Sequence, residues 1–139
     1  MSEEPDVALW PYAKTQHWPG ETLVLRAGVS DLETLRRAEP DSDFPELLVF
    51  SVQSHPGATE GQLLVGDDGL PLFPNGKYRT TTLAAVRDKA SNPRQCLAES
   101  PIEGNTNHCN VVGLTPEDFE SILSKPPTEN RLRRESQRL

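Results

Sequence analysis

The sequence has 139 residues, 35% of them apolar, and a formal net charge of −7. This length fits one domain with a single hydrophobic core, and the 13 prolines predict that part of the chain is loop. No apolar run approaches the roughly 18 residues of a membrane-spanning helix. The negative charge disfavours nucleic-acid binding over most of the surface.

The N-terminus and the cysteines bear on the cellular compartment. Residues 1–6 lack the basic start and the apolar stretch of a signal peptide. The two cysteines, Cys96 and Cys109, are too few for a disulfide framework. We therefore expect a cytoplasmic protein, and a bacterial or phage cytoplasm fits.

Charge and composition divide the chain into three parts. Residues 125–139 contain five basic and two acidic side chains, a charge of +3, which leaves −10 for the rest. We predict an irregular N-terminal arm over residues 1–21 and a single domain over 22–125. Residues 126–139 form a basic tail with the composition of a flexible segment.

The first half of the domain alternates strand and helix signals. Residues 22–26 are β-branched or apolar and follow a Pro-Gly turn, which predicts a strand. Ser30, with Glu33 three residues later, predicts a capped helix over 31–38. The apolar run within 47–53 predicts a strand that is buried at its start.

The middle of the chain carries weaker signals. Residues 62–65 predict a short third strand, and the Asp-Gly pair that follows predicts a turn. Two prolines restrict residues 70–73 to an edge strand or a loop. A helix is expected to begin at Thr80 or Thr81 and to continue to Ala90, because apolar residues recur there at helical spacing.

The last third of the chain has the clearest local pattern. Residues 107–112 predict a strand, and Thr115 followed by Pro116 and two acids predicts the start of a helix. The proline pair at 126–127 ends that helix. Together the elements predict an α+β fold, with one small mixed sheet packed by two or three short helices.

The apolar positions of these elements predict the core. We expect the following side chains to be buried: Leu23, Leu25, Leu48, Phe50, Leu64, Val86, Val111, Phe119, Ile122 and Leu123.

The sequence contains none of the strong catalytic motifs. A phosphate-binding P-loop, a dinucleotide-binding glycine fingerprint, a His-Glu-x-x-His helix and a Gly-x-Ser-x-Gly elbow are all missing. Cys109 as a nucleophile would need His17 or His55, because adjacent strand residues such as His108 and Cys109 point to opposite faces. No paired zinc motif involves the cysteines, so no metal site is expected. Whether the chain is an enzyme stays open.

Three residues are candidates for ligand binding. His108 and Asn110 share one face of the predicted strand, where two hydrogen-bonding side chains could hold a ligand. Arg26 ends the first strand and could fork onto a phosphate or a carboxylate. The alternatives are a structural histidine with satisfied hydrogen bonds and an arginine paired with a surface acid.

The charge pattern favours a protein partner. The acidic residues of the body can meet a basic partner or imitate phosphates, and the basic tail can meet an acidic one. The candidate partner-binding residues are Asp41, Asp43, Glu46, Asp67, Asp68, Arg131, Arg133 and Arg134. This pattern predicts an adaptor, inhibitor or immunity protein that needs no cofactor.

Two stretches resemble known proteins. Asn105-x-x-His108, followed by Val111 and Gly113, resembles small bacterial proteins of unassigned function. Leu25-Arg26-Ala27, Asp68-Gly69-Leu70 and the strand–helix segment from His108 to Leu123 are similar to type VI-secreted toxins with an ADP-ribosyltransferase-like fold. The toxin resemblance implies toxin or defence biology.

The resemblance to the toxins implies NAD as the ligand. Arg26 would contact a phosphate, and His108 with Asn110 would line the pocket. The Ser-Thr-Ser strand of those enzymes has no counterpart, and Glu99 and Glu103 are the only acids at the place of the catalytic glutamate. The candidate catalytic residues are therefore Arg26, His108, Glu99 and Glu103.

Overall fold

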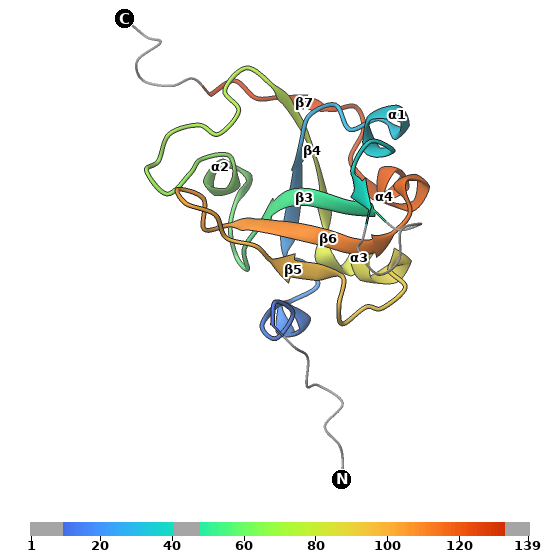
Figure 1. Cartoon of the computed structure of the whole chain (residues 1–139). Helices are drawn as coiled ribbons and strands as arrows, with labels where there is room; N and C mark the ends of the chain where they lie inside the picture. Colours follow the sequence, from blue (N-terminus) through green and yellow to red (C-terminus); the bar gives the residue numbers. More distant parts are fainter. Residues whose placement is uncertain (1–9, 41–47, 133–139) are drawn as a thin grey trace, which may run out of the picture.

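The computed structural model describes residues 10–40 and 48–132 (Figure 1). Within them the elements are η1 (Thr15–His17), β1 (Leu23–Ala27), α1 (Leu32–Leu35), β2 (Glu39–Pro40), β3 (Leu48–Ser54), α2 (Glu60–Leu63), β4 (Lys77–Thr82), α3 (Leu83–Lys89), β5 (Leu97–Glu99), β6 (His108–Leu114), α4 (Pro116–Ile122) and β7 (Thr128–Glu129). These elements confirm the α+β class predicted from the sequence. None of the described helices is long and apolar enough to cross a membrane.

One sheet contains all seven described strands, in the order β5-β6-β3-β1-β4-β7, with β2 beside β3. Every pairing in it is antiparallel. The sheet is therefore antiparallel, and the prediction of a mixed sheet is wrong. The sequence could not decide this point, because the side-chain pattern of a strand carries no information about the direction of its neighbours.

The sheet consists of two ribbons that are joined over a short stretch. β1 pairs with β4 along its whole length, and β3 pairs with β6 from Leu48 to Gln53. Between β1 and β3 only Val24↔Ser54 and Leu25↔Gln53 are in register. Figure 1 shows the two ribbons crossing, so β1 separates from β3 immediately after Leu25. This separation creates the space in which the candidate site lies.

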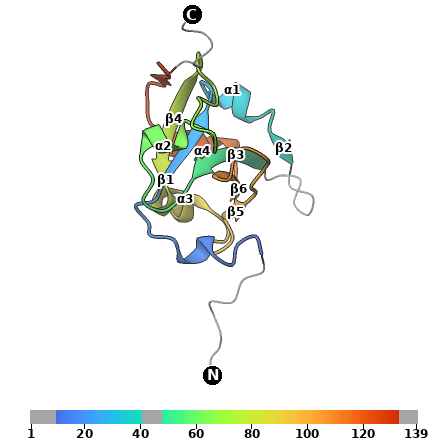
Figure 2. The ribbon, with the colours of Figure 1, turned by 90° about the vertical axis from the view of Figure 1, so that its left-hand side faces the viewer.

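The two faces of the sheet carry cores of different size. Helices α1, α3 and α4 cover one face, where Leu35, Val86 and Phe119 pack against Phe50 and neighbouring strand residues. Helix α2 covers part of the other face, where a smaller group contains Leu25, Leu63, Leu64 and Tyr78 (Figure 2). The second face is thus left partly open.

The predicted core is largely confirmed. Buried residues are Leu25, Phe50, Leu64, Val86, Val111, Phe119 and Leu123. Leu23, Leu48 and Ile122 are half-buried instead.

Helix caps explain several boundaries. Thr115 accepts a hydrogen bond from the Asp118 N–H, as predicted for α4. Helix α1 is capped by Asp31 rather than Ser30, because Ser30 has a positive φ of 54° and its hydroxyl donates to the Ala27 carbonyl. The hydrogen bonds from Thr34 to the Asp31 carboxylate lower the pKa of Asp31.

Four elements between residues 60 and 99 differ from the prediction. Residues 60–63 form helix α2 instead of a strand, because Thr59 and Gln62 make a reciprocal capping box. Strand β4 was not predicted, and α3 begins after Thr82 rather than at Thr80 or Thr81. Strand β5 is only three residues long and was also missed.

The described residues before and after the predicted domain are bound to it. Arg87 donates to the carbonyls of Thr15, Gln16 and Trp18, which holds η1 against α3. Beyond residue 125, β7 pairs with β4, and the buried Asn130 donates its side-chain amide to the Phe73 carbonyl. The sheet therefore continues past the predicted start of the tail.

Candidate functional site

The structure brings the three predicted ligand-binding residues to one cavity. This arginine cavity has a volume of about 440 Å³ and is lined by Arg26, Ala38, Val49, Ser51, His108 and Asn110. Ser51 of β3 lies opposite Asn110 of β6 in the sheet register, and Gln53 lies opposite His108. Arg26 is the first residue of β1 after its pairing with β3 ends, so the cavity lies where these two strands have separated.

Arg26 fills part of the gap between the two ribbons. Its Nη1 donates to the Ser51 carbonyl at 2.8 Å, and its guanidinium carbon lies 6.0 Å from the centre of the Phe50 ring. The Nε atom is buried and has no hydrogen-bond partner within residues 10–40 and 48–132. Burial lowers the pKa of Arg26, and no carboxylate pairs with it among the described residues.

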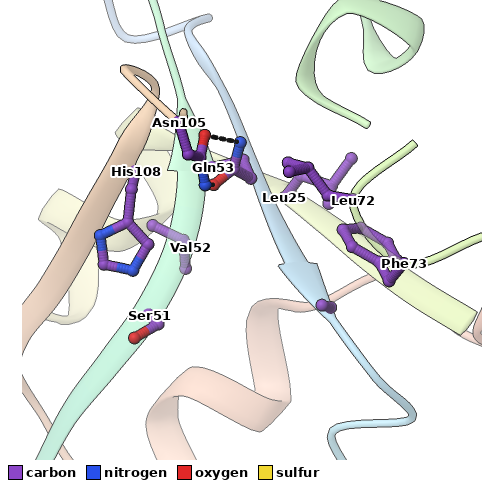
Figure 3. Close-up of a pocket in the computed structure, with 9 residues that line it drawn as sticks. Leu25, Ser51, Val52, Gln53, Leu72, Phe73, Asn105 and His108 are labelled. Carbon is purple, nitrogen blue, oxygen red and sulfur yellow. Dashed lines mark hydrogen bonds between the residues drawn. The ribbon is translucent and has the colours of Figure 1, made fainter. Parts of the chain in front are cut away.

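His108 is oriented by the backbone of a neighbouring loop. Its Nδ1 lies 2.7 Å from the Ser100 carbonyl oxygen. Because a carbonyl can only accept, Nδ1 donates this hydrogen bond, which leaves Nε2 for another partner. In Figure 3 the ring points away from β6 toward Ser51.

A second, smaller cavity adjoins the first. This phenylalanine cavity has a volume of about 140 Å³, and it shares Ser51 and His108 with the arginine cavity. Its other lining residues are Leu25, Ala27, Val52, Gln53, Leu72, Phe73 and Asn105. Through this shared lining the two cavities are neighbours, and together they are called the cleft; Arg26 lines the first, and mainly apolar surface lines the second.

An amide pair fixes the wall of the phenylalanine cavity. Gln53 Nε2 donates to Asn105 Oδ1 at 2.9 Å, and Asn105 Nδ2 donates back to Gln53 Oε1 at 2.7 Å (Figure 3). Gln53 also donates to the Leu63 carbonyl. Both side chains are buried, so this reciprocal pair holds β3 and the loop before β6 in a fixed position.

The two candidate glutamates lie elsewhere. Glu99 is half-buried on β5 and lines a third cavity, whereas Glu103 is exposed in the loop between β5 and β6. Neither lines the arginine cavity. The structure therefore does not bring a carboxylate to the cleft from these positions.

The described partner-binding candidates are exposed. Asp67 accepts hydrogen bonds from the Thr106 N–H and hydroxyl, which lower the pKa of Asp67, and Asp68 accepts from the Leu70 N–H. Arg131 is exposed at the end of the described chain. The other candidates, Asp41, Asp43, Glu46, Arg133 and Arg134, lie outside the described residues, and partner binding stays a prediction.

Cys109 and His108 point to opposite sides of β6, as the strand prediction requires. Cys109 is buried with its thiol toward the Ser54 carbonyl, and burial raises its pKa to about 12. Burial likewise raises the pKa of Cys96 to about 11. Among the described residues no group of His, Cys, Asp and Glu side chains is arranged to hold a metal ion.

These thiols are expected to be unreactive in the folded protein. At pH 8 neither Cys96 nor Cys109 should react with a thiol-specific reagent within the time in which a small free thiol is consumed, because both are protonated and buried. Both should react after denaturation in urea. Rapid reaction of one thiol in the native protein would contradict the arrangement of β5 and β6 described above.

Several residues of the cleft were not predicted from the sequence. Leu72 and Phe73 come from a segment without regular structure, and Gln53 was assigned only to a strand. Asn105 belongs to the Asn-x-x-His motif, which was the one signal that pointed to it. No family model matches the sequence, and neither curated proteins nor solved structures give a match.

Proposed function

We propose that this protein binds a small anionic ligand that carries a single flat ring, and that a nicotinamide nucleotide is the best fit among known ligand classes. The anionic group would occupy the arginine cavity, and the ring would occupy the phenylalanine cavity. The observation that carries the proposal is the half-buried guanidinium of Arg26, which has no carboxylate partner among the described residues.

An anion in the arginine cavity would compensate for the burial of this charge. Removing a cation from water is costly unless an opposite charge or hydrogen bonds replace the lost solvent. With the described part of the chain, Arg26 forms one side-chain hydrogen bond, to the Ser51 carbonyl, which leaves most of its donors for a ligand. The lining contains no acidic side chain, and the Ser51 hydroxyl and Asn110 amide make no hydrogen bond with described residues. These groups can donate to a phosphate or a carboxylate.

The size of the apolar end limits the ring. A cavity of roughly 150 Å³ is large enough for one benzene molecule, and the phenylalanine cavity has about 140 Å³. Phe73, Leu72 and Leu25 supply apolar walls, and the amide pair of Gln53 and Asn105 supplies polar atoms at the edge. A single six-membered ring with a carboxamide therefore fits better than a two-ring purine.

Calorimetric titration with nicotinamide mononucleotide, nicotinamide riboside and NAD tests this proposal. The mononucleotide and NAD should bind. The riboside should bind at least about tenfold more weakly, because it lacks the phosphate and its charge-assisted hydrogen bonds. Arg26→Gln should remove this preference. Arg37→Gln is the matched control, since Arg37 is exposed and pairs only with Glu33 among the residues that the structure describes.

The melting temperature of Arg26→Gln must be recorded, because Arg26 also supports the Ser51 carbonyl. If no binding occurs at millimolar nucleotide, or if the riboside and the mononucleotide bind equally well, the proposal fails. Equal phosphate preference in Arg26→Gln and in the parent would exclude Arg26 as the anion-binding group.

A further inference from the structure

A third cavity contains both tryptophans of the chain. This tryptophan cavity has a volume of about 440 Å³, and its lining includes Trp10, Trp18, Lys14, His55, Glu99 and Pro101. Trp10 is 68% exposed, which is unusual for so large an apolar side chain. Trp18 packs against the main core and meets His55 edge to face at 6.0 Å.

Glu99 adds a negatively charged side chain to the lining of this cavity. It is half-buried at the end of β5, opposite Cys109 in the register. Its carboxylate makes no ion pair or hydrogen bond with the described residues. Burial raises the pKa of the Cys109 thiol, and the nearby charge of Glu99 adds to this effect.

We propose that the tryptophan cavity binds a small organic cation of the trimethylammonium type. Indole faces attract cations through the electrostatic field of the ring, and this attraction grows when water is displaced. A carboxylate beside the rings adds an opposite charge. The cavity offers both groups together, and its volume lies within the usual range for small-molecule sites.

A methylated ammonium suits this lining better than a primary ammonium. A trimethylammonium group has no N–H donor to satisfy and loses little hydration when it contacts apolar surface. A primary ammonium would need several hydrogen-bond acceptors inside the cavity. Indole and proline rings provide apolar contact, and Glu99 provides the charge without a directed hydrogen bond.

Lys14 gives this proposal a specific consequence. It is exposed, lines the same cavity, and forms no ion pair with Glu99 in the structure. Its positive charge opposes the entry of a second cation. Removing this charge should therefore strengthen binding, whereas removing the charge of Glu99 should weaken it.

Intrinsic fluorescence reports on this site directly, because the chain has only two tryptophans and both line the cavity. We expect saturable quenching or a spectral shift with choline. Its neutral isostere 3,3-dimethylbutan-1-ol, which has the same shape without the charge, and ethanolamine, which has a primary ammonium, should each bind about tenfold more weakly.

Four variants complete the test. Glu99→Gln should weaken choline binding about tenfold, and Lys14→Gln should strengthen it a few-fold. Glu103→Gln, which removes an exposed charge outside the cavity, should leave the affinity unchanged. Trp10→Leu should weaken binding without unfolding the protein, since Trp10 is largely exposed.

Equal affinity for choline and the neutral isostere would overturn the proposal, as would unchanged affinity in Glu99→Gln. Absence of any response to choline at concentrations up to about 50 mM, which would reveal even a weak cation–π site, would overturn it too. The proposed nucleotide site is tested separately, because choline carries no phosphate and Arg26 does not line the tryptophan cavity. Failure at one cavity leaves the other proposal standing.

Discussion

Replacing Arg79 with methionine is expected to lower the free energy of unfolding by about 3–5 kcal/mol, the usual loss when a buried charged network is broken. Arg79 is 2% exposed on β4. Its Nε and Nη1 donate to the carbonyls of Ser124 and Ser30, each at 2.7 Å, and its Nη2 lies near the Leu123 and Glu120 carbonyls. Methionine would leave these buried acceptors without a donor. Urea unfolding at equilibrium measures the loss.

Two further variants separate geometry from charge. Arg79→Lys keeps the positive charge, but its donors all lie on one nitrogen and cannot replace Nε and Nη1 at two separate carbonyls, so this variant should also be clearly destabilised. Arg36→Gln should cost less than about 1 kcal/mol, because its pair with Glu117 is exposed on both sides. If Arg79→Met unfolds at the same urea concentration as Arg36→Gln, Arg79 does not hold α4 to β4 as described.

The parts of the fold that could be predicted depend on local signals. The β6–α4 unit was predicted because its apolar alternation, N-cap threonine and N1 proline lie within a dozen residues. Strand β4 was missed because Lys77–Thr82 is polar and contains three threonines, which suit both a strand and a helix cap. Its stability comes from pairing with β1, which the local sequence does not reveal.

Some residues of the candidate site could likewise be predicted from local signals, and others could not. Strand periodicity placed His108 and Asn110 on one face, and the end of the first strand supplied Arg26. Phe73 could not be found, since it reaches the cleft from an irregular segment. The role of Arg79 was also hidden, because its acceptors Ser30 and Ser124 are more than 40 residues away along the chain. Long-range hydrogen bonds leave no periodic trace in a sequence.

The aromatic contact between β3 and α4 leads to the second large effect. Phe119 is fully buried, and its ring centre lies 4.7 Å from that of Phe50. Replacing Phe119 with alanine should lower the free energy of unfolding by about 3–5 kcal/mol, because the variant loses apolar burial and leaves a cavity. Thermal and urea unfolding both measure this loss.

Two controls and a ligand measurement sharpen the Phe119 prediction. Phe119→Leu keeps much of the volume and should lose less stability, and Ile122→Ala removes a half-buried side chain of the same helix.

Phe50 also lies beneath the Arg26 guanidinium, so the cavity left by Phe119→Ala reaches the residue that supports the proposed anion site. Nucleotide affinity should therefore fall in Phe119→Ala even at temperatures where the variant is folded, and it should be retained in Ile122→Ala. If the melting temperature of Phe119→Ala lies within about one or two degrees of the parent's, α4 does not pack on Phe50.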